Sequence, residues 1–421
     1  MIVQRTETHI IKESNPIYRW ILEECSRSKN LYNKTLYIYR QAFTGNHDKI
    51  EDFKSIIRHD KFISSFELVK QMAKLKDVDY YAMTKKNSGT QIVCQVDKVI
   101  KSWFASLKAY KKDPSKFRGR PRIPSYKKKD ELNCLIYTYV DARLQKDGTI
   151  KISKKIKLPI HTNLKNFQQI RLVPKTGYIQ VEIIYNKEIS DLKLDQTRAI
   201  GIDLGLNNLM AITSNIGNIS NLVNGRPLKS INQYYNKRKA HLTSLLEKGG
   251  LKSSKRLRGL EMKRNCKLKD YLHKSSRRVV ELMEQNNIGT CFIGHNKDWK
   301  QEVEMGKKNN QNFVSIPYSL LINMLRYKIE EKGGQLVELN ESYTSKCSFL
   351  DNEEVCKHET YKGKRVKRGL FLSSKSKTLN ADINGSLNIL KRGIGFSFMV
   401  KNNIFRPTKI DIQKKLLNPL G

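Results

Sequence analysis

The chain has 421 residues, and its 80 lysines and arginines against 40 aspartates and glutamates give a formal net charge of +40. Such an excess is far larger than solubility requires, and it implies a polyanionic partner. A hydrophobic content of 38% supports packed cores and excludes a disordered basic tail, and the length predicts two to four domains. No apolar run reaches the roughly 18 to 20 residues of a membrane span, and the first residues lack a signal-peptide pattern. We therefore expect a cytoplasmic protein with no membrane partner.

The first half of the chain predicts a helical region enclosed by strands. Residues 2–11 alternate and are rich in β-branched side chains, which is typical of a strand, but no hairpin partner is nearby. Apolar residues recur every three to four positions over 15–109 and predict helices. Short alternating runs over 132–187, bounded by glycine and aspartate, predict a small β-barrel or sheet that pairs with the first strand.

A basic segment connects these two regions. Residues 101–130 contain eleven lysines and arginines, two aspartates, and the proline-stiffened sequence KFRGRPRIPSYKKK. Cations interleaved with Phe117 and Tyr126 in an extended segment suit a phosphate backbone. A solvated charged face is the alternative.

The second half predicts an α/β domain. Four apolar runs, AIGID at 199, LMAIT at 209, TCFIG at 290 and QLVEL at 335, have the composition of strands buried on both faces. A long basic helical stretch over 228–285 and an amphipathic helix over 316–332 lie between them. Strands separated by helices indicate a central sheet covered by helices.

Two aspartates stand at positions suited to metal chemistry. Asp203 ends a buried strand and is followed by Gly205, a design that both actin-like ATPases and RNase H-like nucleases use. Asp382, in TLNADINGSLNIL, stands at a predicted helix start, 179 residues further along. Two such carboxylates are a metal-site candidate, and the second glycine-rich phosphate loop of an actin-like ATPase is absent from the sequence. The alternative for Asp382 is a plain charge at a helix N-terminus.

At these residues the chain resembles the TnpB family, the RuvC-like nucleases encoded by insertion sequences, which are related to compact type V CRISPR effectors. The segments that carry the resemblance are KDPSKFRGRPRIPSYKKK, GIDLGLNNLMAITS, NGRPLKSINQYYNKRK, GHNKDWKQ, NNQNFVSIPYSLL, ESYTSKCSFL and NADINGSLNIL. Membership implies a DNA endonuclease that carries a guide RNA derived from its own element and cuts target DNA beside a short flanking motif. It also implies an RNase H-like RuvC domain, a β-barrel wedge domain and a helical recognition lobe, and we expect a monomer.

The expected domains follow from the resemblance and the patterns together. They are a wedge strand (1–14), a helical recognition domain (15–112), a wedge β-barrel (113–195), a RuvC domain (196–342) with a helical insertion at about 228–285, a basic insertion (343–378), and the C-terminal part of RuvC with a tail (379–421).

The second RuvC motif departs from the family. Asp203 matches the first motif and Asp382 the third, but Gly294 stands where the family has a strand-ending glutamate. In an RNase H-like sheet the strand QLVEL would neighbour that of Gly294 at about 4.8 Å, so an acid at its end is a substitute. We favour Glu341 at the strand's end, with Glu338 as the runner-up.

His295 and Asp298 are nearer substitutes in the sequence and rank below both glutamates. With Asp203, Glu341 and Asp382 as catalytic and metal-binding residues, the resemblance implies phosphodiester hydrolysis with two Mg²⁺ ions. Two other functions remain open: a nuclease-dead, RNA-guided DNA-binding repressor, which Gly294 favours, and a compact CRISPR-associated effector with the same chemistry.

The region between the second and third motifs lacks the family's four cysteines. The seven cysteines of the chain form no CxxC pair, and only Cys347, Cys356 and His358 stand here, so we expect no zinc. Residues 361–377 instead hold seven lysines and arginines and no acid, which suits either nucleic acid or a solvated loop. The expected nucleic-acid-binding residues are Arg118, Arg120, Arg122, Lys127, Lys128, Lys300, Arg365 and Arg368.

Overall fold

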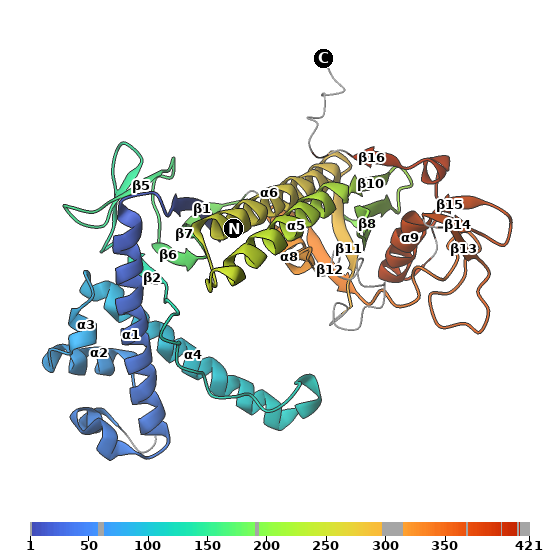
Figure 1. The fold of residues 1–421 in the computed structure, drawn as a ribbon. Helices are drawn as coiled ribbons and strands as arrows, with labels where there is room; N and C mark the ends of the chain where they lie inside the picture. The colour runs from blue at the N-terminus through green and yellow to red at the C-terminus, as the bar shows by residue number, and fades with distance from the viewer. Residues whose placement is uncertain are drawn as a thin grey trace. The chain divides into compact units, whose positions relative to one another are not determined.

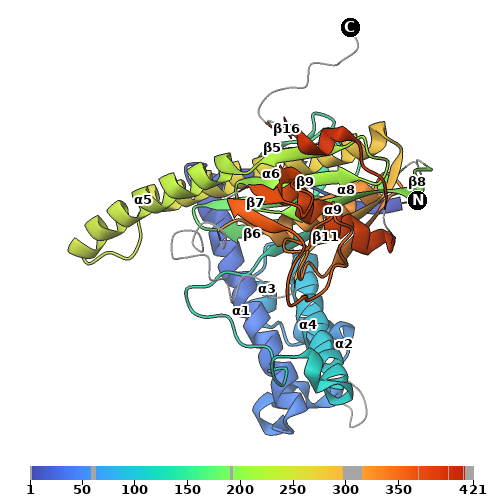
Figure 2. The same ribbon diagram turned by 90° about the vertical axis from the view of Figure 1, so that its right-hand side faces the viewer.

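The chain forms two compact units, Ile2–Glu188 and Ile189–Gly421, in the computed structural model (Figures 1 and 2). The structure describes residues 2–57, 63–189, 193–296, 315–367, 369–396, 398–410 and 412. Lys300 and Arg368, two of the expected nucleic-acid-binding residues, and Asp298 lie outside these described residues. The six-part division expected from the sequence stays a prediction.

Helices make up most of the first half of the N-terminal unit. The helical run expected over 15–109 is divided into α1 (Ile17–Phe43), η1 (His47–Ile56), α2 (Ser65–Lys74), α3 (Val78–Tyr81) and α4 (Lys86–Lys112), with η2 (Pro114–Lys116) after it. Buried apolar side chains of α1, α2 and α4 meet those of the strands in one hydrophobic core. The three-to-four spacing of these residues explains why each helix buries one stripe.

The strands of the N-terminal unit form two antiparallel sheets. One has the order β1 (Ile2–Lys12), β7 (Tyr178–Glu188), β6 (Gln169–Lys175), β2 (Leu135–Thr138), and the other has β3 (Arg143–Leu144), β4 (Thr149–Lys151), β5 (Lys157–His161). The pairing expected for the first strand is confirmed, since β1 pairs with β7 from Ile2↔Glu188 to Lys12↔Tyr178. The expected barrel is not found as a closed one: within the described residues, no pairing joins the two sheets or closes either of them.

A six-stranded mixed sheet organises the C-terminal unit. Its order is β12 (Gln335–Leu339), β11 (Ile288–Gly294), β8 (Asp195–Leu204), β9 (Asn208–Ser214), β10 (Ser220–Asn224), β16 (Thr408–Ile410). The strands β8, β9 and β10 pair antiparallel, whereas β8 with β11, β11 with β12, and β10 with β16 pair parallel. All four strands expected from the sequence are therefore confirmed, and β11 and β12 are neighbours as expected.

Helices cover both faces of this sheet. The helices α6 (Lys255–Gln285) and α8 (Tyr318–Glu330) share a core with Ile202 and Leu204, while α9 (Ala381–Ile394) packs through Ile383 and Leu387 on the face of Ala211. Because side chains alternate along a strand, Asp203 points to the α9 face. The stretch expected as one helical insertion is a hairpin of two long helices, α5 (Arg226–Lys248) and α6.

A small antiparallel sheet precedes α9. Its order is β13 (Lys364–Lys367), β14 (Leu370–Leu372), β15 (Thr378–Asn380), and η3 (Asn402–Phe405) follows α9. The basic stretch 361–377 thus carries a hairpin of strands and not only a loop. Within the described ranges, none of the helices is both long enough and apolar enough to cross a bilayer.

Candidate active site

Three carboxyl groups converge at one edge of the C-terminal sheet. Asp203 lies near the end of β8, Glu341 lies two residues beyond β12, and Asp382 lies in the first turn of α9. The strands β8, β11 and β12 run parallel, so their carboxyl ends meet at the same edge. The structure therefore brings together the three acids that the sequence singled out.

Asp203 is held in an environment that opposes its ionisation. Its pKa is raised well above its ordinary value, first by burial and then by the negative charges of Asp382 and Glu341, while Arg365 acts in the opposite direction. A Cβ on Gly385 of α9 would lie 2.7 Å from Oδ2 of Asp203. Glycine at 385 is thus what leaves room for this carboxyl group against the helix.

Asp382 is not the cap of its helix. Asn380 is the N-cap, and its Oδ1 accepts hydrogen bonds from the backbone N–H groups of Asp382 (2.9 Å) and Ile383 (3.3 Å). The carboxylate of Asp382 instead accepts a hydrogen bond from Nδ2 of Asn208 (2.7 Å) and lies 3.7 Å from the half-exposed guanidinium of Arg365. The capping role is therefore filled without Asp382, whose side chain faces the turn after Asp203.

Glu341 fills the space that a side chain at position 294 would take. Gly294 pairs with Leu339 across β11 and β12. A Cβ on residue 294 would lie 3.1 Å from Cβ and 3.2 Å from Oε2 of Glu341, and 2.6 Å from Cδ1 of Ile389. Burial raises the pKa of Glu341 to about 7. A side chain at 294 would thus meet Ile389 first and Glu341 next, so glycine at 294 leaves room for Glu341 beside it.

Glu338, the runner-up, is engaged elsewhere. Its carboxylate pairs with Arg326 of α8 and with Nδ1 of His295 at 2.9 Å. His295, another substitute considered from the sequence, is thereby tied to Glu338. The charges that shift the pKa of Asp203 are those of Asp382, Glu341 and Arg365, and neither Glu338 nor His295 is among them.

One stripe of α9 holds the backbone that carries Glu341. Asn388 donates hydrogen bonds to the carbonyl oxygens of Thr344 and Cys347, both at 2.8 Å, and Asn384 donates to that of Cys347 at 2.8 Å. Arg392 donates to the carbonyl oxygens of Asn340 and Ser342. The spacing of four places all three side chains on one helix face, so α9 supplies Asp382 and also fixes the segment of Glu341.

We expect Asn388→Ala to lower the free energy of unfolding by about 2 kcal/mol, because the carbonyl group of Thr344 loses this buried donor and that of Cys347 keeps only the bond from Asn384. Urea unfolding of the two proteins measures the difference. Asn236→Ala, in the half-exposed middle of α5, is the matched control and should stay within about 0.5 kcal/mol of wild type. Equal effects at the two positions would contradict this account of the stripe.

Tyr318 is a residue of this site that the sequence reasoning missed. It is buried, and its hydroxyl donates to the carbonyl oxygen of Gly205 at 2.9 Å. Burial raises its pKa, and the charges of Asp203 and Glu341 raise it further. The sequence places this tyrosine directly after Pro317, at the start of an apolar helix. In that position a tyrosine is expected to pack in the core, so nothing in the sequence assigns it to the site.

The basic segment of the N-terminal unit lies along α1. Asn33 exchanges two hydrogen bonds with the backbone of Lys127, at 2.8 and 2.9 Å, and the ammonium of Lys127 lies 5.1 Å from the ring centre of Tyr32. The other expected residues of this segment, Arg118, Arg120, Arg122 and Lys128, are exposed. The segment is therefore an ordered cationic surface of this unit.

Three potential zinc ligands lie close together after Glu341. Sγ of Cys356 is 3.4 Å from Nε2 of His358, which also contacts the carbonyl oxygen of Glu354 at 2.8 Å, and Sγ of Cys347 contacts the carbonyl oxygen of Cys356 at 3.5 Å. Among the described residues, no three histidine, cysteine or acidic side chains surround one point as a metal site would. The expectation about zinc stays a prediction.

Comparison with known proteins gives two family matches. Both lie in the C-terminal unit, except that the first begins in the last residues of the N-terminal unit. Residues 182–300 match the family OrfB_IS605, described as a probable transposase, and residues 318–389 match the Cas12f1-like TNB domain. A curated relative, "TnpB-like protein ORF457" of Acidianus two-tailed virus, is 25% identical over 242 residues, which cover 56% of this chain and 50% of that protein. The chain thus spans about half the length of this relative.

Comparison with solved structures gives two matches over most of the chain. One is a Cas12f1–sgRNA–target DNA complex, 15% identical, with a TM-score of 0.49, covering 87% of this chain and 82% of that one. The other is the mini RNA-guided endonuclease CRISPR-Cas_phi3, 9% identical, with a TM-score of 0.46, covering 95% and 94%.

Proposed function

We propose, from the premise that the chain belongs to the TnpB family, that it is an RNA-guided DNA endonuclease with a RuvC active site. Its partners are a guide RNA from its own element and a target DNA that carries a short flanking motif. The order and directions of the six strands support an RNase H-like RuvC domain. The net charge of +40 supports partners that carry many phosphates.

The catalytic acids are Asp203, Glu341 and Asp382. The observation that carries this assignment is the fit between Gly294 and Glu341: Oε2 of Glu341 lies 3.2 Å from the place of a Cβ at 294. A glutamate at the end of β12 thus takes the space of the family's glutamate at the end of β11. This supports an active nuclease over a nuclease-dead repressor, because an abandoned site would not require glycine at 294 to be matched by glutamate at 341.

The donor set fits Mg²⁺. Three carboxylates provide oxygen ligands only. Burial, and then the charges of Asp382 and Glu341, raise the pKa of Asp203, and a bound cation would favour its ionised form. Mg²⁺ keeps several waters and needs one or two carboxylates per ion, so two ions do not require three ligands around one point. Bound Mg²⁺ would supply the charge that activates water and stabilises the leaving 3′ oxygen.

The residues around the acids have positioning roles in this proposal. Asn208 orients the carboxylate of Asp382, Tyr318 fixes the turn at Gly205, and the α9 stripe fixes the segment of Glu341. Arg365 lies beside Asp382, so it neutralises part of the acidic charge before metal binds and can contact a phosphate afterwards. The exposed arginines of the basic segment contact the nucleic-acid backbone.

We expect Mg²⁺ to stabilise the protein more at about pH 8 than at about pH 5.5. Without metal, the pKa of Glu341 of about 7 exceeds its unfolded value near 4.5, so its contribution to stability is full below 4.5 and is lost as pH rises through 7. The loss amounts to about 3 kcal/mol. Metal binding needs the ionised groups, so it restores stability at the higher pH. Thermal unfolding with and without Mg²⁺ at both pH values tests this, and equal shifts would contradict it.

The test of the proposed function is purification followed by cleavage. The protein should co-purify with an RNA transcribed from its flanking DNA and should cut matching DNA when Mg²⁺ is added. Elution free of nucleic acid, with no binding of such a transcript, would refute guidance by RNA. Whether the gene belongs to an insertion sequence or accompanies a CRISPR array follows from the neighbouring genes, since the chemistry is the same.

A further inference from the structure

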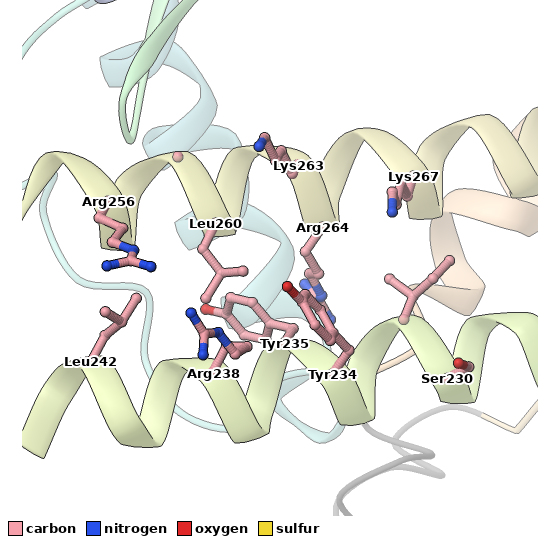
Figure 3. Close-up of a pocket in the computed structure, with 12 residues that line it drawn as sticks. Ser230, Tyr234, Tyr235, Arg238, Leu242, Arg256, Leu260, Lys263, Arg264 and Lys267 are labelled. Atoms are coloured by element: carbon pink, nitrogen blue, oxygen red, sulfur yellow. The ribbon is translucent and has the colours of Figure 1, made fainter.

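The hairpin of α5 and α6 contains a groove with an apolar floor and a cationic rim (Figure 3). Its volume is about 690 Å³. The floor is formed by Ile231, Tyr234, Tyr235, Leu242 and Leu260, and the rim by Arg238, Arg256, Lys263, Arg264 and Lys267. No acidic side chain lines it. The groove therefore suits an anionic ligand that also has flat apolar faces.

The cations of the rim are available to a ligand. Arg264 is the exception, because it donates to Asn232 and to the carbonyl oxygen of Ser315, both at 2.9 Å, and stacks on Tyr235. In the described part of the chain, the other four rim cations have no carboxylate within ion-pair distance. Tyr234, which lines the groove, is 63% exposed. A tyrosine that only packed in a core would be buried, so the side chain of Tyr234 is accessible to a ligand.

The helix α6, which forms one side of the groove, is tied to the edge of the sheet where the three acids lie. The hydroxyl of Tyr271 in α6 donates to the carbonyl oxygen of Asn224 at the end of β10. Asn224 pairs with Asn208, which in turn binds Asp382. The buried residues of α6 begin at Leu268, so residues 255–267, about 20 Å of helix at 1.5 Å per residue, precede the part that packs on the sheet. A second hollow shares Ser230, Ile231 and Lys267 with the groove and extends it to Tyr271. Its one acid is Asp270, which pairs with Lys274.

We propose that this groove binds the single DNA strand that continues from the active site, with its phosphates on the rim and a base stacked on Tyr234. This inference rests on the proposed function for the identity of the strand. A double helix hides the faces of its bases, whereas an unpaired strand offers them to an aromatic ring. The strand at the sheet edge is the one that the acids would cut, which identifies it as DNA.

The test is photocrosslinking of the full-length chain, without Mg²⁺ and at elevated salt, to a single-stranded DNA oligonucleotide that carries 5-iododeoxyuridine. We expect crosslinks on the peptide that contains Tyr234. Tyr234→Ala should reduce that crosslink and weaken binding of the oligonucleotide about tenfold, the size of one base stacked on a ring, and Tyr234→Phe should retain both. Lys237→Ala, an exposed cation of α5 outside the groove, is the control and should change neither.

The inference is overturned if the Tyr234 peptide is not crosslinked, or if Tyr234→Ala leaves binding unchanged. It is also overturned if an RNA of the same sequence crosslinks in preference, or if Tyr234→Ala turns a dimer into a monomer. Guided cleavage by the wild type separates this inference from the proposed function. Cleavage with no dependence of strand binding on Tyr234 refutes only the groove, while Tyr234-dependent binding of DNA by a protein that cuts nothing refutes only the proposed function.

Discussion

Replacing Asp203 by alanine is expected to reduce guided DNA cleavage at least about a thousandfold. Asp203 is buried, and its pKa is raised first by that burial and then by the negative charges of Asp382 and Glu341, which lie near it. In the proposed site Asp203 is a metal ligand, so its removal weakens metal binding, and each 1.4 kcal/mol of lost transition-state stabilisation costs a factor of ten. The rate of single-turnover cleavage of a labelled target measures the effect.

Binding should survive the same change. Asp203→Ala removes a buried carboxyl group and none of the exposed cations, so the affinity for guide RNA and for target DNA should stay within a few-fold of wild type. Asp195→Ala is a matched control, because this aspartate begins the same strand and pairs with Arg198 at the opposite edge. It should retain cleavage. Cleavage by Asp203→Ala at the wild-type rate would exclude the site from the reaction.

Glu341→Gln is expected to lose cleavage to a comparable degree, whereas Glu338→Gln should keep most of it. The amide retains the size of Glu341 beside Gly294 but lacks the negative charge that a metal requires. Glu338 faces His295 and Arg326, so its loss breaks a pair at the surface that contributes little. Single-turnover rates of the two variants, loaded with the same guide, give the comparison.

If Glu338→Gln lost cleavage and Glu341→Gln kept it, Glu338 would be the third catalytic acid in place of Glu341. Loss of cleavage in neither variant would mean that Asp203 and Asp382 suffice, or that an acid outside the described residues completes the site. Equal unfolding temperatures of the two variants in the absence of metal would exclude a difference in folding as the cause.

Most of the sheet could be predicted from the sequence because its strands are buried on both faces and thus read as continuous apolar runs. That β11 and β12 are neighbours followed from the RNase H-like sheet that the family resemblance implies. The barrel expected in the N-terminal unit did not follow, because alternation fixes which face of a strand is buried but does not decide whether a sheet closes. The helical hairpin was read as one stretch, since the turn around Gly249 and Gly250 interrupts a basic pattern that continues on both sides.

The site shows the same division between local pattern and tertiary contact. Asp203 and Asp382 stand at a strand end and a helix start, which a sequence reveals. The choice between Glu338 and Glu341 needed side-chain partners that lie far away in the chain, such as Arg326. Likewise, nothing local to Arg365 indicates that it would meet Asp382. Tyr318 was missed for this reason too, because its contact with Gly205 joins residues 113 positions apart.

The measurement that tests the account most directly is binding of Mn²⁺, a substitute for Mg²⁺ that also takes oxygen ligands, followed by electron paramagnetic resonance. At about pH 8, where Glu341 is ionised, wild type and Glu338→Gln should bind Mn²⁺ alike. Glu341→Gln should bind at least about tenfold more weakly. Unchanged affinity in Glu341→Gln, or a loss confined to Glu338→Gln, would contradict the assignment of Glu341 as the acid that replaces the missing one at Gly294.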